Sequence, residues 1–582
     1  MKNDRVLLIQ PPLSYICMPS CALGRLKASL LYQNIPCDCA YLNLDLASIL
    51  DKEPFSWMVT HSPVANTLME VLYASELFPD YVTTDRFLRI VQRFYRGVEL
   101  RSFMRLRRSV RQFNQQVLEK WRRRFPYSIV GLTANYHLMM SLYWGAALKR
   151  LHPNVQIVIG GQSCTGEMGH ALGKTFPFLD WVVSGEGEEV LPEIVRIIRS
   201  GSEEVPASTG RRRAGTFIIN SDPRRLLDLD DLPIPDYDDY FNSTSWRRIE
   251  LLLDSPIKIP VEASRGCWWG KCTFCGERFR GAHSYRRMSD KRVVETMEDL
   301  ARRHKRLSFF FVDCVYPVKV ESLANALCRS RYDFDFYMPL RANISREQLK
   351  FLKQAGLRTG VVGIESFCDN ILKKMKKGTT FIENLLFLKA ARELNIDTGF
   401  NIISPFPGES RKDRLQNIKN IKKALHLMRG FDYWSSCELF YGSPMYCHPS
   451  EFGIKSIKPS RFYKYVLPKR YRFQPVYFWE FSLRQRRRHI VPEPIFLRGD
   501  YGSLEMNVGG DSFCLVRDRR MALGRWCDYI FTSPHCDILV ACMSAKRREE
   551  LPFPKSVIQD LVDLDLLAES EGIYLTLATR SV

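Results

Sequence analysis

Cys267-Trp-Trp-Gly-Lys-Cys272-Thr-Phe-Cys275 is the stretch that decides the fold of this chain. It follows an apolar run at 257–263 and the turn-like Ser264-Arg265-Gly266. Three thiolates on one short loop can hold three irons of a [4Fe–4S] cluster, which leaves the fourth iron open to a small molecule. A structural zinc site would need a fourth ligand nearby, and His283 is the only candidate. Buried structural thiols are the third interpretation, although they seldom cluster in a glycine-containing loop.

The stretch resembles the cluster loop of radical S-adenosylmethionine (SAM) enzymes. Phe274, just before the last cysteine, and Gly276, just after it, fit that family and are implied to lie beside SAM. The spacing departs from the family, because four residues separate Cys267 from Cys272 instead of the usual three. The phrase at 264–270 is similar to the cobalamin-binding branch that modifies ribosomally made peptides. The resemblance therefore implies three cofactors: a [4Fe–4S] cluster on Cys267, Cys272 and Cys275, SAM, and cobalamin.

Composition favours a large enzyme of a reducing compartment. The chain has 582 residues, enough for about three to five domains, and its 45% hydrophobic content allows large cores. No basic start leads into an apolar run, and no stretch approaches ~20 apolar residues, so we expect a cytoplasmic protein without a membrane span. In such a protein the 17 cysteines predict thiols rather than a disulfide framework.

The formal net charge of +21 raises the question of a nucleic-acid partner. The basic residues gather at 101–124, 211–213 and 484–488, and no recognised nucleic-acid motif accompanies them. A surface that attracts an anionic leader peptide explains the charge as well, and an unspecialised solvated surface is the remaining interpretation. The sequence does not favour nucleic acid.

Residues 1–200 alternate between strand-like and helix-like segments. The predicted strands are 6–10, 39–43, 129–133, 156–160 and 181–184, the predicted helices are 23–33, 139–151 and 167–176, and a helical insertion occupies about 47–125. This order is typical of a doubly wound α/β fold with a parallel sheet. We expect a Rossmann-like domain.

Ligands of such sheets bind beyond the carboxyl ends of the strands. The loops expected there are rich in glycine, which lets backbone approach a large flat ligand, although tight turns explain glycine equally well. Combined with the resemblance, they give these candidate cobalamin contacts: Pro12, Thr133, Asn135, Gly160, Gly161, Gln162, Ser163, Gly185, Glu186 and Gly187.

Many cobalamin domains carry Asp-x-His-x-x-Gly, whose histidine ligates cobalt. This chain lacks the motif, and His137 is the nearest alternative. We therefore expect cobalt without a histidine ligand from the protein.

Residues 201–256, acidic and rich in proline, predict a linker. From 257 to 450 a second alternation follows. Its predicted strands are 259–263, 307–312, 334–338, 360–364, 397–403 and 433–439, and its predicted helices are 290–304, 319–330, 345–355, 381–394 and 411–428. Six strands make a partial (β/α)6 barrel, the shape that radical SAM cores share. The cluster loop follows the first strand, and barrel enzymes place their chemistry at such strand ends.

Other strand-end residues are candidate SAM contacts by the same resemblance. Glu365 and Ser366 resemble the motif that hydrogen-bonds the ribose. Arg341 and Asn343 are placed to meet the methionine carboxylate, Asn401 to contact SAM, and Asp313 to bind its amino group. A capping or turn residue is the alternative for each.

Residues 451–582 predict a small α+β region that binds substrate or leader. A helix at 555–568 and a strand at 573–578 suggest a winged-helix-type module, which by analogy grips a peptide as an added strand. The aromatic run at 475–481 either lines a substrate cleft or packs on the barrel.

The resemblance implies a C-methyltransferase. A radical derived from SAM removes hydrogen from an unactivated carbon of a ribosomally made precursor peptide, and a methyl group passes from SAM through cobalamin to that carbon. A reducing partner such as flavodoxin or ferredoxin would supply electrons. Two alternatives stay open: a rearrangement or cyclisation without methylation, and an iron–sulfur regulatory protein.

Overall fold

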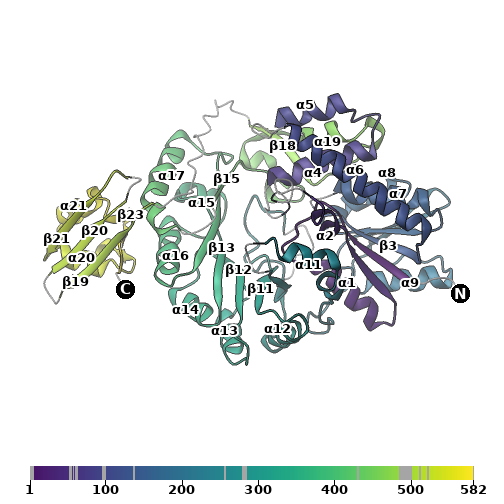
Figure 1. The fold of residues 1–582 in the computed structure, drawn as a ribbon. Coiled ribbons are helices and arrows are strands. Elements are labelled where there is room, and N and C mark those ends of the chain that lie inside the picture. The colour runs from purple at the N-terminus through teal and green to yellow at the C-terminus, as the bar shows by residue number, and fades with distance from the viewer. Residues whose placement is uncertain are drawn as a thin grey trace.

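The computed structural model describes residues 5–580 apart from 51–55, 57, 59–62, 95–99, 136–137, 254–256, 278–284, 429–431, 484–500, 510–512 and 521–522. His137, His283 and the basic run at 484–488 lie outside the described residues. The fold is α/β with two parallel sheets, as predicted (Figure 1). No described helix has both the length and the apolar character needed to span a membrane.

The first sheet has the strand order β2-β1-β3-β4-β5-β6-β7. Its parallel part comprises β1 (Arg5–Gln10), β2 (Cys37–Tyr41), β3 (Tyr127–Thr133), β4 (Gln156–Gly160) and β5 (Trp181–Val183). These strands are short apolar runs because helices cover both faces of the sheet. The sheet confirms the predicted Rossmann-like domain.

Two findings differ from the sequence prediction. The hairpin β6 (Thr209–Arg213) and β7 (Thr216–Asn220) extends the sheet with antiparallel strands inside the predicted linker. The predicted strand at 39–43 instead ends at Tyr41, where α2 (Leu42–Ala47) begins.

Helices cover this sheet and form a separate layer beside it (Figure 1). The covering helices are α1 (Cys21–Tyr32), α7 (Leu138–Leu151), α8 (Glu167–Thr175) and α9 (Val190–Ser200). The predicted insertion consists of α4 (Pro63–Leu77), α5 (Thr84–Phe94) and α6 (Leu100–Arg123). The apolar stripe of α6 is buried, including Phe103, Leu106 and Val110, while its basic side faces solvent.

The remainder of the predicted linker is packed rather than extended. It carries α10 (Asp238–Phe241) and α11 (Thr244–Glu250), and two of its tyrosines are fully buried. Tyr240 Oη donates to Ile16 O over 2.6 Å, and Tyr237 Oη donates to Pro260 O over 2.9 Å. The connector therefore fixes the first domain against the second.

The second sheet has six parallel strands in the order β15-β14-β13-β12-β11-β8. They are β8 (Ile259–Val261), β11 (Ser308–Phe311), β12 (Asp335–Arg341), β13 (Leu357–Glu365), β14 (Asp397–Ile403) and β15 (Asp432–Ser435). The intervening helices are α12 (Asp290–His304), α13 (Val320–Cys328), α14 (Arg346–Gln354), α15 (Asp369–Lys374), α16 (Phe381–Glu393) and α17 (Arg411–Ala424). In the described residues β8 and β15 do not pair, so the barrel is partial, as predicted.

The segment after the barrel strands divides into two parts. The first begins before the predicted boundary at 451, with β16 (Leu439–Phe440) and α18 (Pro444–Cys447), and continues with β17 (Ile454–Pro459), α19 (Arg461–Val466) and β18 (Phe478–Leu483). Its residues Val466, Leu467 and Val476 join the core of the first domain, and Trp479 of the aromatic run packs against that core.

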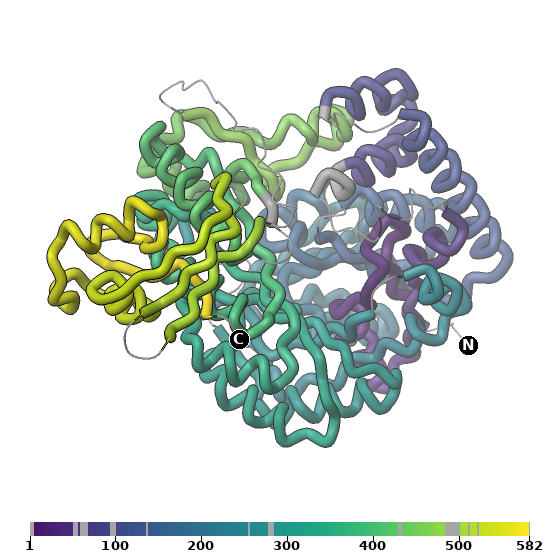
Figure 2. The backbone as a smooth tube through the Cα atoms, turned by 60° about the vertical axis from the view of Figure 1, so that its left-hand side comes forward, coloured from purple at the N-terminus to yellow at the C-terminus, as the bar shows by residue number. Residues whose placement is uncertain are grey.

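The second part packs on the barrel core (Figure 2). One sheet holds β19 (Leu504–Gly509), β20 (Phe513–Asp518), β21 (Cys527–Thr532) and β25 (Thr579–Arg580). The rest runs α20 (His535–Ala541), β22 (Lys546–Arg547), α21 (Lys555–Asp563), β23 (Leu567–Ser570) and β24 (Ile573–Thr576), an order typical of winged-helix modules. The predicted helix at 555–568 is shorter because 567–568 already belong to a strand.

Candidate active site

The cluster loop is fixed by its backbone to segments distant in the sequence. Thr273 N donates to Met375 O over 2.9 Å, and Met445 N donates to Thr273 O over 3.0 Å. The indole of Trp269 donates to Lys376 O over 3.0 Å. These contacts use backbone and indole groups, and the half-buried Cys267, Cys272 and Cys275 form no disulfide. All 17 cysteines are thiols, as predicted.

The three thiols match the donor set of an open iron–sulfur cluster. Each thiolate of a [4Fe–4S] cluster binds a different iron, so the three sulfur atoms need not meet at one point. His283, the fourth ligand that a zinc site would need, lies outside the described residues. A donor set of three thiols therefore fits an iron–sulfur cluster.

Basic groups surround the loop. Lys377 Nζ lies 3.0 Å from Glu365 Oε1, and both side chains are largely buried, at 8% and 12% exposure. Burial raises the pKa of the Cys272 thiol above its ordinary value, although Lys377 and Arg341 act in the opposite direction. Burial alone would lower the pKa of Lys377, but Glu365 and Cys272 raise it above normal. The lysine thus stays cationic beside the thiols, which suits an anionic cluster.

Arg341 and Asn343 brace the loop in this structure. The guanidinium of Arg341 lies over the rings of Trp268 and Trp269, 5.5 and 4.5 Å from their centroids. It donates to Lys377 O over 2.5 Å and to Asn343 Oδ1 over 3.3 Å. The predicted contact of Arg341 and Asn343 with the methionine carboxylate of SAM would be made in addition to these interactions.

Asn401 is partly hydrogen-bonded, and Phe274 packs against another aromatic ring. Asn401 Nδ2 donates to Ser435 Oγ over 2.8 Å, while its buried Oδ1 has no hydrogen-bond partner among the described residues. That acceptor fits a donor from a ligand. The ring of Phe274 lies edge-on to Phe406 with centroids 6.4 Å apart, next to the cluster loop.

Ser366 and Asp313 have structural contacts. The Ser366 hydroxyl is fully buried and donates to Asn417 Oδ1 over 3.3 Å, so in this arrangement it is not open to a ligand. Asp313 accepts hydrogen bonds from Ala263 N over 3.2 Å and from Ser264 Oγ over 2.5 Å. Its burial raises its pKa to about 7. Asp313 therefore holds the end of β8 in place.

The loops at the carboxyl edge of the first sheet interlock. Asn135 Oδ1 accepts from Gln162 N over 3.2 Å, and Ser163 Oγ donates to Asn135 O over 2.9 Å. Gly161 has φ +113°, and a Cβ there would lie 2.6 Å from Asn135 Oδ1. Asn135, Gly161, Gln162 and Ser163 thus lie together at this edge.

The same edge fits a large ligand with amide groups. Gln162 Oε1 is buried without a hydrogen-bond partner among the described residues, so it can accept from a ligand. Gly185 is exposed with φ +113°, and a Cβ there would meet no atom within 4 Å. Gly160 ends β4 next to Thr133, which ends β3. Pro12 is buried after β1.

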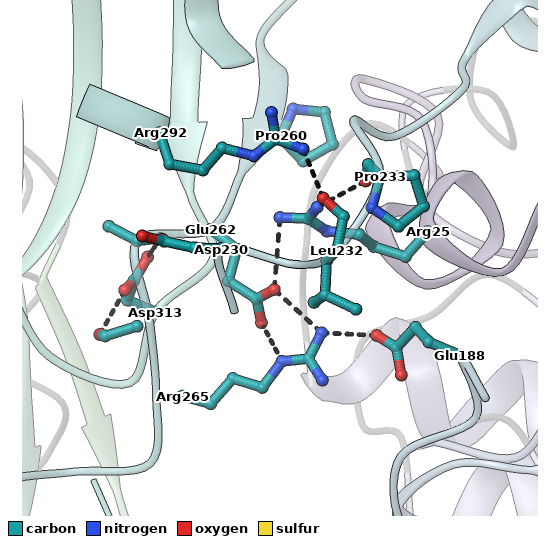
Figure 3. A network of polar contacts seen from close by, with 12 residues as sticks. Arg25, Glu188, Asp230, Leu232, Pro233, Pro260, Glu262, Arg265, Arg292 and Asp313 are labelled. Atoms are coloured by element: carbon teal, nitrogen blue, oxygen red, sulfur yellow. Dashed lines mark hydrogen bonds and ion pairs between the residues drawn. The ribbon is translucent and has the colours of Figure 1, made fainter. Parts of the chain in front are cut away.

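Six charged residues link the carboxyl edge of the first sheet to the carboxyl edge of the barrel. Figure 3 shows four of them together: Arg25, Glu188, Glu262 and Arg265. Arg265, two residues before Cys267, donates to Glu262 over 2.7 Å and to Glu188 over 2.5 Å. Its Nη1 lies 3.2 Å from Glu186. Arg286 also pairs with Glu186, and Arg25 Nη2 lies 3.5 Å from Glu262. Glu188 and Glu186 follow β5, so the loop after β5 contacts the loop after β8.

This charge network gives Glu186, which we predicted as a cobalamin contact, a second set of partners. Its carboxylate is engaged by two arginines. Burial alone would raise the pKa of Glu188, but Arg265 and Arg25 outweigh that effect and lower the pKa. Sequence reasoning missed Arg25, Glu188, Glu262 and Arg265, because no local pattern links residues so far apart.

The barrel matches a known family model. The model of the radical SAM superfamily matches residues 261–421, which include the cluster loop, the last residue of β8 and the whole of β11, β12, β13 and β14. Residues 261–421 form a radical SAM domain.

Curated relatives share part of the chain. An uncharacterized methyltransferase of Pyrococcus horikoshii is 27% identical over 52% of this chain and 65% of its own length. The hopanoid C-3 methylase of Methylococcus capsulatus is 28% identical over 43% of this chain and 48% of its own length. The chain thus spans less than two thirds of the length of these relatives.

A solved structure shares the fold of this chain beyond the radical SAM domain. The radical S-adenosylmethionine methyltransferase TsrM of Kitasatospora setae, solved with cobalamin and a [4Fe–4S] cluster, superposes with a TM-score of 0.53. The match is 17% identical and covers 77% of this chain and 78% of that one. The α/β fold is therefore that of cobalamin-dependent radical SAM enzymes, as predicted.

Proposed function

We propose that this chain is a cobalamin-dependent radical SAM methyltransferase that methylates an unactivated carbon of a ribosomally made precursor peptide. One observation carries the proposal: Arg265 and Arg286, which flank the three-thiol loop of the barrel, pair with Glu186 and Glu188 in a strand-end loop of the Rossmann-like sheet. The names of the methyltransferase relatives and the fold shared with TsrM support it. The location we propose is the cytoplasm, where an oxygen-labile cluster stays reduced.

Three cofactors follow from the proposal. When bound, the cluster and SAM supply a 5′-deoxyadenosyl radical, and cobalamin supplies the methyl carrier. Cys267, Cys272 and Cys275 hold the cluster. Lys377 and Glu365 keep a fixed charge pair beside it, and Asn401 offers an acceptor to SAM.

The sheet edge is suited to hold the corrin. Gly160, Gly161 and Gly185 allow close backbone approach, and Gln162 offers an acceptor to a corrin side chain. The chain's part in catalysis is placement, because reacting groups held in one geometry gain much of their rate from proximity.

Cobalt would lack a protein histidine. Within the described strand-end loops 11–20, 133–135, 161–166 and 184–189, no residue is a histidine. Electron paramagnetic resonance of the cob(II)alamin form tests this point, since nitrogen splitting from a protein imidazole would contradict it.

The peptide substrate is supported by charge and by the C-terminal module. A net charge of +21 attracts an anionic leader, and the winged-helix-like order of 535–576 is a fold that can add a peptide as a strand. A reducing protein such as flavodoxin or ferredoxin completes the set of partners. The proposal includes neither nucleic acid nor a membrane.

The test combines product analysis with cysteine variants. Anaerobic protein is incubated with methyl-deuterated SAM, cobalamin, a reductant and the precursor peptide. We expect 5′-deoxyadenosine and a peptide heavier by a deuterated methyl group. Cys267→Ala, Cys272→Ala and Cys275→Ala should each abolish both products, whereas the exposed Cys447→Ala should not.

Each other outcome has a defined meaning. Normal turnover by any of the three cysteine variants would refute the cluster assignment. 5′-Deoxyadenosine with an altered but unlabelled peptide would replace methylation by rearrangement or cyclisation. Absence of 5′-deoxyadenosine from the wild-type protein would favour an iron–sulfur regulatory protein.

A further inference from the structure

A short two-stranded ribbon closes the base of the cluster-loop segment. In β9 (Ser264–Arg265) and β10 (Arg286–Arg287), Arg265 pairs with Arg286 and Ser264 with Arg287 in antiparallel register. The three cysteines lie between these strands in the sequence. The ribbon therefore fixes where the cysteine-bearing segment leaves the barrel and returns to it.

The ribbon has an unfavourable charge pattern on its own. Like charges directly opposite each other on neighbouring strands repel, and here two arginines face each other. The carboxylate of Glu186 interacts with both: it lies 3.2 Å from Nη1 of Arg265 and accepts from Arg286. Glu188 binds Arg265 as well, over 2.5 Å. Two carboxylates of the other domain, together with Glu262 of the barrel, thus stabilise the closed ribbon.

Both carboxylates belong to the loop that is predicted to contact the corrin. Glu186 stands between Gly185, which leaves open space for a ligand, and Gly187. The side chains of Arg265 and Glu188 are only 18% and 9% exposed, so solvent screens this contact weakly. A ligand that holds this loop in place would consequently also hold the charges that close the cluster-bearing segment.

From this geometry we propose that Glu186 and Glu188 are positioning residues that couple the two cofactor sites. They clamp the β9–β10 ribbon, so that a corrin on the sheet domain slows loss of the cluster and the cluster strengthens binding of the corrin. The inference rests on the proposed function, and it assigns to the loop after β5 a role beyond corrin contact. Coupling between two binding sites is reciprocal, and its usual size is about 5- to 150-fold.

The experiment measures cluster loss rather than turnover. Reconstituted protein is mixed with an iron chelator, with or without hydroxocobalamin, and the rate of iron release is followed. Wild type is compared with Glu186→Gln and Glu188→Gln. The control is Glu189→Gln, in the same loop, whose side chain is 55% exposed and lies 3.8 Å from Arg224.

We expect hydroxocobalamin to slow iron release at least about fivefold in wild type and in Glu189→Gln. In Glu186→Gln and Glu188→Gln the slowing should fall below about twofold. Equal slowing in all four proteins would overturn the coupling, as would its loss in Glu189→Gln. A wild-type protein that takes up no cluster would instead contradict the proposed function.

A second measurement tests the same coupling in case Glu186→Gln or Glu188→Gln folds poorly. Arg265→Lys keeps the positive charge but loses the planar fork that reaches three carboxylates. Hydroxocobalamin affinity is measured with and without the cluster in wild type and in this variant. The cluster should strengthen binding in wild type by about fivefold or more, and by much less in Arg265→Lys. An equal factor in both proteins would overturn the proposal.

Discussion

The carboxyl edges of the two sheets differ in charge. The barrel edge holds Lys377, Glu365, Arg341 and Asp313 around three thiols, whereas the interlocked loops of the first sheet hold Thr133, Asn135, Gln162, Ser163 and glycines. The first arrangement suits an anionic cluster and a charged small molecule. The second suits a large flat ligand that offers amides and apolar surface. The difference indicates that each edge is specialised for one class of cofactor before any ligand arrives.

Two charged side chains lie near the carboxyl edge of the first sheet, but they point away from its ligand-facing loops. Glu186 and Glu188 face the arginines of the β9–β10 ribbon. The interface between the domains therefore carries the charge that the ligand-facing loops of the first sheet lack.

The largest expected effect concerns the charged carboxyl edge of the barrel. Lys377→Gln leaves the carboxylate of Glu365 buried without its partner. Breaking a buried ion pair costs about 3–5 kcal/mol, and we expect a loss of that order in the free energy of unfolding. Urea denaturation measures it. Lys373→Gln, which removes the exposed pair with Glu571, is the control and should leave stability nearly unchanged. Equal effects of the two substitutions would contradict a buried charge pair at the cluster loop.

At the uncharged carboxyl edge of the first sheet, cobalamin binding should instead be sensitive to added side-chain volume. Gly161→Ala combines a positive φ with a clash against Asn135 Oδ1, so the interlocked loops must open. We expect cobalamin affinity, measured by absorbance titration, to fall about tenfold, which equals roughly 1.4 kcal/mol. Gly215→Ala in the β6–β7 turn has φ +83° and open space around it, and it should bind cobalamin like wild type. Unchanged affinity of Gly161→Ala would remove these loops from the site.

A further expected effect is a pH dependence of stability behind the uncharged edge. Glu70 is buried and accepts from Met139 N over 3.0 Å, where α7 begins. Burial raises its pKa from 4.5 to about 8. The folded protein thus retains a proton that the unfolded chain releases, so this contribution to stability is full below about pH 4.5 and is lost as the pH rises through about 8.

Glu70→Gln removes this titration. Thermal unfolding of wild type between pH 5 and 8 should show a decline that the variant lacks, with other groups contributing equally to both. Parallel curves for the two proteins would show that Glu70 is ionised in the folded state, and the uncharged character of this region would be wrong.

Local signals predicted much of the fold. The segments 156–160, 290–304 and 397–403 form their elements with the predicted bounds, because apolar runs and the Ser289 cap mark both ends. The hairpin β6–β7 was hidden by its arginines, which suggest a loop until the strand has a neighbour to pair with.

The candidate site could be predicted only as a set of strand ends. Glycines and cysteines mark where a ligand fits, and parallel strands bring their carboxyl ends to one edge. The partner of each side chain depends on long-range packing. Ser366 therefore turned out to bind Asn417, and Glu186 to bind the arginines of another domain.

The central claim is one open iron–sulfur cluster beside a corrin site, and magnetic resonance tests it most directly. Anaerobically reconstituted protein is reduced, and its electron paramagnetic resonance spectrum is recorded with and without SAM. The account predicts roughly four irons per chain and a cluster signal that changes shape when SAM is added. A fully competent protein that holds zinc or no metal in the loop, or a cluster signal indifferent to SAM, would contradict it.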